Sequence, residues 1–145
     1  MGKKERKREW RSGCPLNASV EMLGDRWSLL IIRDMMLRGA KTFKDFLGGY
    51  EKIATNVLAE RLKSLEAHGV IRAEKDARDG RKVNYVLTEK GIDLAPVLTE
   101  MVLWAATHEA TENPGLVKMM RKDKEGFNQR IREEWEKKRG KEARK

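Results

Sequence analysis

The sequence is poor in the residues that build disulfides, zinc sites and membrane spans. Its 145 residues include one cysteine, Cys14, and two histidines, His68 and His108, which excludes an internal disulfide and makes no recognisable zinc pattern. No apolar run reaches the roughly 18 residues that predict a transmembrane helix. The N-terminal stretch MGKKERKREW carries charge with no apolar segment behind it, so we expect no signal peptide. A cytoplasmic, reduced protein without membrane contact is the simplest expectation.

Charge is abundant but unevenly distributed. The formal net charge is +9, of which residues 1–11 contribute +4 (six Lys/Arg, two Glu) and residues 118–145 contribute +6 (twelve Lys/Arg, six Asp/Glu). The remaining residues, 12–117, carry −1 (fourteen against fifteen). Basic ends are typical of proteins that contact nucleic acid, although tails that only aid solubility have the same composition. DNA binding must therefore be argued from the central residues.

Helical spacing organises the first part of the chain. Cys14-Pro15 precedes a stripe of apolar residues that stops at Gly24, and proline suits the first helical position. Asp25 is expected to cap a second helix over about residues 26–38, ended by Gly39.

Two further helices follow. The segment from Thr42 to Asp45 has the pattern of a capping box and opens a short helix. Thr55 is predicted to cap a longer helix in which leucines recur at helical spacing, and Gly69 ends it.

The pattern then changes to short β-type runs. VIRAEK and KVNYVL are separated by the turn-forming DARDGR, which predicts a β-hairpin with a basic tip. Thr88 begins the next helical stretch. Pro96 within it predicts either a kink or a short helix followed by the main helix. The chain is therefore expected to be mainly α-helical with one small hairpin.

This order of elements is that of a winged helix-turn-helix, whose second helix enters the major groove while the hairpin reaches phosphates. The helix after Thr55 has leucines on one side and small or hydrogen-bonding residues on the other, although a solvated face on a packing helix has the same pattern. Asparagine pairs with adenine, and alanine contacts a thymine methyl group. The predicted DNA-binding residues are Thr42, Lys44, Thr55, Asn56, Ala59, Lys63, Arg78, Arg81 and Lys82.

From about Cys14 to His108 the chain resembles the HxlR-type winged-helix transcriptional regulators. The resemblance is carried by CPL, LGDRWSLLIIRDMM, KTFKDFL, IATNVLAERLKSLEAHGVI and the block DGRKVNYVLTEKGIDLAPVL. It implies a homodimer formed through the first and last helices of the domain, binding to double-stranded operator DNA, and regulation of nearby genes. No cofactor is implied. The dimer-interface residues expected from it are Leu16, Val20, Leu98, Met101 and Trp104.

Three regions are expected: a basic arm (1–12), the winged helix-turn-helix and dimerisation domain (13–112), and a charged helical extension (113–145). The resemblance assigns no role to the extension. Its apolar stripe, Phe127, Ile131 and Trp135, is expected to lie on the domain or on the dimer partner, or to belong to a weakly ordered helix. The final KKRGKEARK is expected to be disordered.

Cys14 is the candidate redox sensor. Several members of the family that the chain resembles sense oxidants or electrophiles through a cysteine in this Cys-Pro position. A thiol at a helix N-terminus has a lowered pKa, because the helix dipole stabilises the thiolate. Alternatively, Cys14 is a small apolar residue at the dimer contact with no sensing role.

Other classes of function remain open at this stage. A winged-helix protein-interaction module would also fit the near-neutral centre. An enzyme is not expected, because no phosphate-binding glycine loop, metal-ligand cluster or Ser/His/Asp pattern is present. A small-molecule effector is unknown. Candidates to line a dimer-interface pocket for one, if they are not simply core residues, are Trp27, Met35, Met36, Met101 and Trp104.

Overall fold

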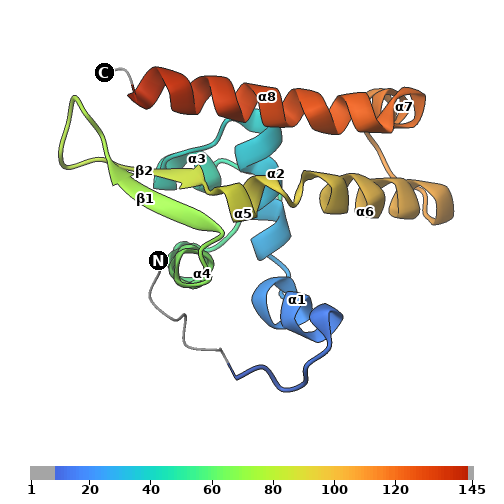
Figure 1. Cartoon of the computed structure of the whole chain (residues 1–145), viewed down its shortest axis with the longest axis horizontal. Coiled ribbons are helices and arrows are strands. Elements are labelled where there is room, and N and C mark those ends of the chain that lie inside the picture. Colours follow the sequence, from blue (N-terminus) through green and yellow to red (C-terminus); the bar gives the residue numbers. More distant parts are fainter. Residues whose placement is uncertain (1–8, 144–145) are drawn as a thin grey trace, which may run out of the picture.

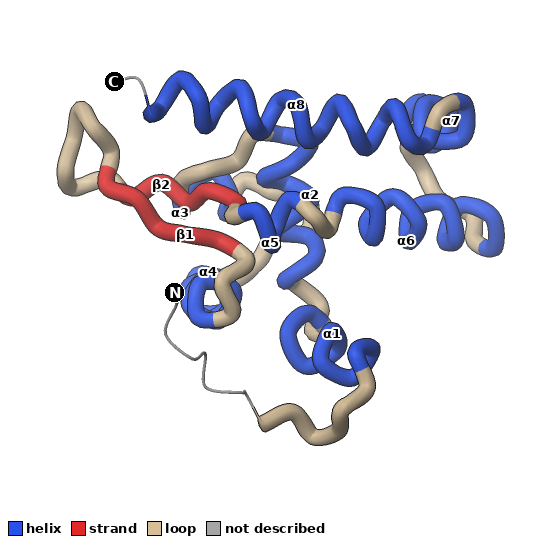
Figure 2. The backbone as a smooth tube through the Cα atoms, viewed as in Figure 1, coloured by secondary structure: helices blue, strands red, loops and turns tan. Residues whose placement is uncertain are grey.

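The computed structural model describes residues 9–143 of the chain (Figures 1 and 2). Most of the predicted basic arm, residues 1–8, lies outside the described residues. The described part confirms the mainly helical fold with one antiparallel hairpin. Its elements are α1 (Pro15–Leu23), α2 (Ser28–Arg38), α3 (Phe43–Leu47), α4 (Thr55–Ala67), β1 (Ile71–Lys75), β2 (Val83–Leu87), α5 (Glu89–Ile92), α6 (Ala95–His108), α7 (Pro114–Lys122) and α8 (Lys124–Ala143).

One predicted helix cap is wrong in position and another is confirmed. The N-cap of α2 is Trp27, two residues after the predicted Asp25. The Asp25 carboxylate still accepts hydrogen bonds from the backbone N–H groups of Trp27 (2.8 Å) and Ser28 (2.9 Å) just before the helix. At α3 the capping box is complete. The Asp45 N–H donates to Thr42 Oγ1 (3.1 Å), and the Thr42 N–H donates to the Asp45 carboxylate (3.0 Å).

The predicted cap at Thr55 is wrong by one position. Ala54 is the N-cap of α4, with an extended backbone and a carbonyl that accepts the N–H of Leu58 at 2.9 Å. Thr55 is the first helical residue, and no side chain caps this end. Ile53 is buried in the core, so tertiary packing fixes where the chain enters α4 and overrides the local preference for threonine at the cap.

The hairpin is followed by a short helix and then the main helix, which is the second of the two arrangements that Pro96 predicted. Strands β1 and β2 pair antiparallel from Ile71↔Leu87 to Lys75↔Val83. The short α5 precedes α6, and Pro96 lies in the first turn of α6, where its missing N–H costs no hydrogen bond. Gly91 in α5 is required by close packing, since a Cβ there would lie 2.2 Å from the Val70 carbonyl oxygen.

The core is formed mainly by α2, α4, the hairpin and α5. Its fully buried members include Ile32, Leu58, Leu62, Leu65, Ile71 and Ile92. The three leucines of α4 face this core, as their spacing predicted. Helix α4 is therefore held by one face, and its opposite face is left to solvent.

Helix α8 crosses the domain and lies beside α6 (Figure 1). Phe127 is buried, and Ile131 and Trp135 pack against the core. The Trp135 indole Nε1–H donates a hydrogen bond to the Leu87 carbonyl at 2.8 Å. The apolar stripe thus lies on its own domain. The expected disorder after residue 136 is wrong as far as Ala143, because the helix continues to that residue.

Candidate nucleic-acid interface

The exposed face of α4 carries the side chains predicted to read DNA. Thr55, Asn56, Ala59 and Lys63 are all exposed, whereas the leucines between them are buried. Arg61 lies between these two faces and forms an ion pair with Asp25 (3.5 Å), which joins α4 to the start of α2. The structure therefore places the four polar or small residues together on one rigid, solvent-facing surface.

The N-terminus of α4 is open. No side chain caps it, and its first turn contains no acidic residue. The unpaired N–H groups of a helix start carry partial positive charge, which favours a phosphate or another anion. An exposed Asn56 next to such a helix start can approach a base edge while the backbone meets the adjacent phosphate.

The turn between α3 and α4 is tied to α2. The Arg33 guanidinium donates two hydrogen bonds to the Glu51 carboxylate, both at 2.8 Å. These bonds lower the pKa of Glu51 to about 2 and raise the pKa of Arg33. A bidentate pair of this kind fixes the geometry of the turn, and with it the placement of α4.

This ion pair gives a stability that depends on pH. The ordinary pKa of Glu51 is 4.5 and the folded value is about 2, so its contribution is full above pH 4.5 and is lost as pH falls toward 2. Because the Glu51 side chain is 32% exposed, we expect Glu51→Gln to lower the free energy of unfolding by about 1 kcal/mol at pH 7. Urea titrations of both proteins should show that difference shrinking between pH 5 and 3. A difference independent of pH would contradict the assignment.

The hairpin tip is a basic loop whose backbone N–H groups are held by the carboxylates of Asp76 and Asp79. Asp76 accepts hydrogen bonds from the N–H groups of Arg78 (2.8 Å) and Asp79 (3.2 Å) and from the Asn84 side-chain amide (3.1 Å). The backbone N–H of Arg78 makes the largest contribution to lowering the pKa of Asp76. With the backbone ordered in this way, the side chains of Arg78, Arg81 and Lys82 are all exposed.

The other predicted contacts lie at the start of α3. Lys44 is exposed, and the half-buried Thr42 uses its hydroxyl to accept the capping hydrogen bond. Tyr50, in the turn before α4, was not among the predicted residues. It is 82% exposed and lies under the Arg38 guanidinium, 4.4 Å from the ring centroid. A single tyrosine in a loop has no periodicity, so no pattern in the sequence singled it out.

Cys14 is exposed and is the N-cap of α1. Its pKa is lowered, chiefly by the backbone N–H of Asn17 and next by that of Leu16. Exposure was the property that the sequence could not supply. The thiol is therefore accessible, and its thiolate form is favoured relative to that of an ordinary cysteine.

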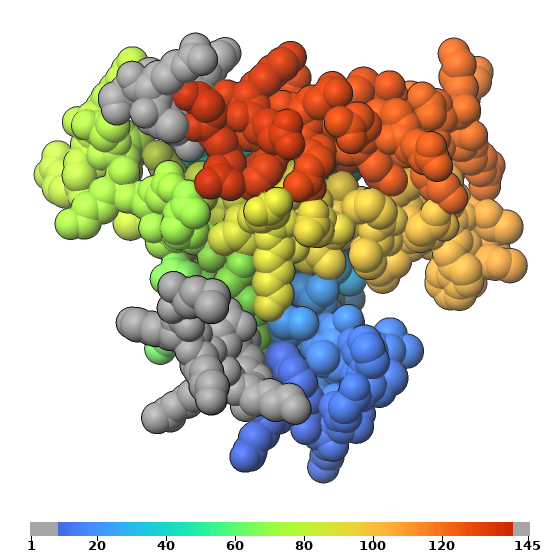
Figure 3. All heavy atoms as spheres, viewed as in Figure 1, coloured from blue at the N-terminus to red at the C-terminus, as the bar shows by residue number. Residues whose placement is uncertain are grey.

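Exposed apolar side chains lie on α1 and on α6, the helices predicted to form the dimer. Leu16 and Val20 on α1 are 70% and 57% exposed, and Met101 and Trp104 on α6 are 50% and 67% exposed. Leu98, also predicted for the interface, instead packs partly against the core. In Figure 3, with the hairpin tip at the upper left, α6 (gold) lies at the right and α1 (blue) at the bottom.

Within one subunit, the five residues predicted to line a dimer-interface effector pocket are not brought together. Met101 and Trp104 lie on the exposed surface just described. Trp27 packs on the core from one side, while Met35 and Met36 border a hollow with Trp135. Within residues 9–143, no helix is long and apolar enough to cross a membrane, and no cluster of His, Cys, Asp and Glu side chains could hold a metal ion.

Comparison with known proteins agrees with this geometry. The model of the family described as HxlR-like helix-turn-helix matches residues 22–113. The HTH-type transcriptional regulator YodB of Bacillus subtilis is 39% identical over 93 residues, which cover 63% of this chain and 82% of YodB. YvaP of the same organism, an HTH-type transcriptional regulator, is 36% identical and is covered to 85%, again over 63% of this chain.

Solved structures of transcriptional regulators resemble this fold as well. The reduced form of YodB superposes with a TM-score of 0.55 at 36% identity, covering 67% of this chain and 95% of that one. The oxidised form of the redox regulator HypR superposes with a TM-score of 0.59 at 28% identity, covering 68% of this chain and all of HypR. YodB has also been solved after diamide treatment and bound to a quinone. These relatives are transcriptional regulators, not enzymes.

Proposed function

Because the chain belongs to the HxlR-like helix-turn-helix family of transcriptional regulators, we propose that it acts as a homodimer on operator DNA near the genes it regulates. The membership confirms the resemblance recognised in the sequence. The observation that carries the proposal is the exposed face of α4, along which Thr55, Asn56, Ala59 and Lys63 lie while the leucines of the opposite face are buried in the core.

The two copies of α4 in the dimer enter successive major grooves about 34 Å apart, and the operator is an inverted repeat. The wing residues Arg78, Arg81 and Lys82 contact phosphates on either side. Support for the dimer comes from the exposed apolar side chains of α1 and α6, such as Leu16 and Trp104. Large exposed apolar side chains of this kind often mark a protein–protein interface.

Replacing Asn56 by alanine tests the proposal. We expect the variant to lose about 1–3 kcal/mol of binding free energy on the true operator and to discriminate less between operator and random duplex, because a bidentate base contact is removed. Fluorescence anisotropy with a duplex from the chain's own upstream region measures both quantities.

Arg81→Ala is the matched contrast for Asn56→Ala. The Arg81 side chain, at the tip of the hairpin, is 95% exposed. Its loss should weaken both duplexes equally and reduce the slope of log affinity against log salt by about 0.9. If Asn56→Ala also weakens both duplexes equally, Asn56 does not read bases, and equal wild-type binding to both duplexes would reject the regulator itself.

The finer proposal is that oxidation at Cys14 controls DNA binding. The exposed thiol, its lowered pKa and the redox relatives support it. The family match begins at residue 22, after Cys14, so the argument rests on the local geometry. With oxidised glutathione, the Cys14 thiolate attacks the disulfide, forms a mixed disulfide and releases one glutathione thiolate.

We therefore expect oxidised glutathione to weaken operator binding by at least about tenfold (1.4 kcal/mol), because a bulky anionic group would then occupy the N-terminus of α1 beside the dimer surface. Cys14→Ser should bind operator normally with or without the oxidant, and dithiothreitol should restore the wild type. Mass spectrometry monitors the adduct. If fully modified wild-type protein binds operator DNA as tightly as the unmodified protein, Cys14 is not a redox sensor, although the chain can still be a regulator.

A further inference from the structure

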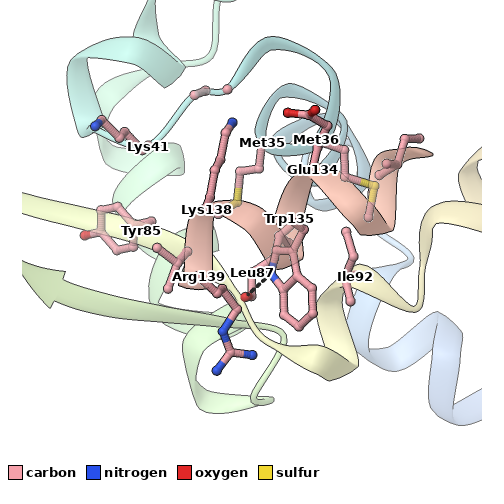
Figure 4. Close-up of a pocket in the computed structure, with 14 residues that line it drawn as sticks. Met35, Met36, Lys41, Tyr85, Leu87, Ile92, Glu134, Trp135, Lys138 and Arg139 are labelled. Atoms are coloured by element: carbon pink, nitrogen blue, oxygen red, sulfur yellow. Dashed lines mark hydrogen bonds between the residues drawn. The ribbon is translucent and has the colours of Figure 1, made fainter. Parts of the chain in front are cut away.

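A hollow of about 110 Å³ opens between α8 and the domain (Figure 4). Helix α8 forms one wall, and the end of α2, strand β2 and α5 form the others. The α8 wall lies beyond residue 113, where the family match ends. The hollow is therefore a feature of how this chain's C-terminal helix docks.

The walls are apolar and one of them is fixed in place. Met35, Met36, Leu87, Ile92 and Ile131 contribute aliphatic or thioether surface. The Trp135 ring faces these groups and is held by its hydrogen bond to the Leu87 carbonyl. A closed apolar cavity of about 150 Å³ takes up benzene, so this smaller, open hollow suits one ring whose polar substituent stays at the mouth.

The mouth is cationic. Lys41, Lys138 and Arg139 border it, against one carboxylate, that of Glu134. Among the side chains of residues 9–140, no carboxylate lies within ion-pair distance of these three cations. In Figure 4, Lys138 extends from α8 toward the end of α2, where its Nζ lies 3.7 Å from the position that a Cβ on Gly39 would occupy. Arg139 instead stacks on Trp135, 4.7 Å from the ring centroid.

We infer that this hollow binds a small organic anion made of one apolar ring and a carboxylate. The ring lies against Trp135 and the two methionines, and the carboxylate meets Lys138 at the mouth. The net positive charge around the mouth disfavours a cationic ligand. A ligand without a ring would leave the apolar walls in contact with water. The inference goes beyond DNA binding and holds whether or not the chain regulates genes.

Binding is tested on the full chain with sodium benzoate as the probe, followed by the Trp indole N–H signals in NMR spectra. Trp135→Phe assigns the Trp135 signal. We expect a saturable shift of that signal and none at the exposed Trp104. Benzylamine, with the same ring and the opposite charge, and acetate, with the charge and no ring, should each produce less than a tenth of the shift at equal concentration. No saturable shift at Trp135, or an equal shift with benzylamine, would overturn the inference.

Two variants locate the site. Lys138→Gln should weaken benzoate binding at least tenfold, while Lys137→Gln, one residue away on the exposed side of α8, should leave it unchanged. Ile131→Phe fills the hollow and should abolish binding, with circular dichroism used to check that α8 is retained. If Lys138→Gln and Ile131→Phe both bind benzoate as the wild type does, the hollow is not the site, and Lys138 serves only as a cation at the end of α2.

Discussion

Replacing Phe127 by alanine is expected to lower the free energy of unfolding by about 3–5 kcal/mol, the range for deleting a buried aromatic side chain. Phe127 is 6% exposed, and the adjacent Asn128 side-chain oxygen accepts a hydrogen bond from the buried Thr99 hydroxyl at 2.6 Å. The loss would fall on the contact between α8 and α6. Urea unfolding followed by circular dichroism measures it.

Phe127→Leu is the control, because it keeps most of the buried volume and should cost less than about 1.5 kcal/mol. A two-state transition shifted in midpoint with unchanged slope would mean that α8 unfolds together with the domain. If Phe127→Ala changes the free energy of unfolding by less than about 0.5 kcal/mol, α8 does not stabilise the domain. The hollow beneath α8 would then lack a stably docked helix on one side.

Replacing Trp104 by glutamate is expected to convert the dimer to monomer at micromolar concentration and to weaken operator binding at least about 100-fold, since a buried unpaired charge costs several kcal/mol. Trp104 is 67% exposed on α6, in line with Met101 on the same face. Sedimentation velocity measures the oligomeric state, and anisotropy measures DNA binding. The thermal unfolding of the monomer should change little, because the side chain packs on nothing in its own core.

Met119→Glu provides the matched control for Trp104→Glu. Met119 is 53% exposed on α7, outside the predicted interface, so the same change of charge should leave the dimer intact. If Trp104→Glu stays dimeric, the interface lies elsewhere. If Met119→Glu dissociates the dimer instead, the interface is formed by α7 and not by α6.

Local chemistry predicted the winged helix-turn-helix core well. The capping box at Thr42 and Asp45, the helical leucines of α4 and the hairpin around Gly80 all depend on neighbours close in the chain. Short-range patterns carry this information because hydrogen-bonded caps and amphipathic faces need only a few residues. The polar face of α4 could be named for the same reason, since burying one side of a helix exposes the other.

Long-range packing decided the features that the sequence left open or led us to predict wrongly. The C-terminal helix has a weak pattern and a high charge, so its extent to Ala143 depends on the docking of Phe127 and Trp135. The N-cap of α4 is Ala54 and not the predicted Thr55, because the burial of Ile53 fixes where the chain enters the helix. Tyr50 and Cys14 are exposed for reasons of tertiary placement alone.

The sequence by itself determined the order of helices and strands, the side of α4 that faces the core and the absence of a second cysteine. The tertiary structure alone decided that α8 packs back on the hairpin strand, that the Cys14 thiol is exposed and that Lys138 borders an apolar hollow. Periodicity and capping act between residues a few positions apart. Exposure and cavities arise instead from contacts such as that of Trp135 with Leu87, which lie 48 residues apart in the chain.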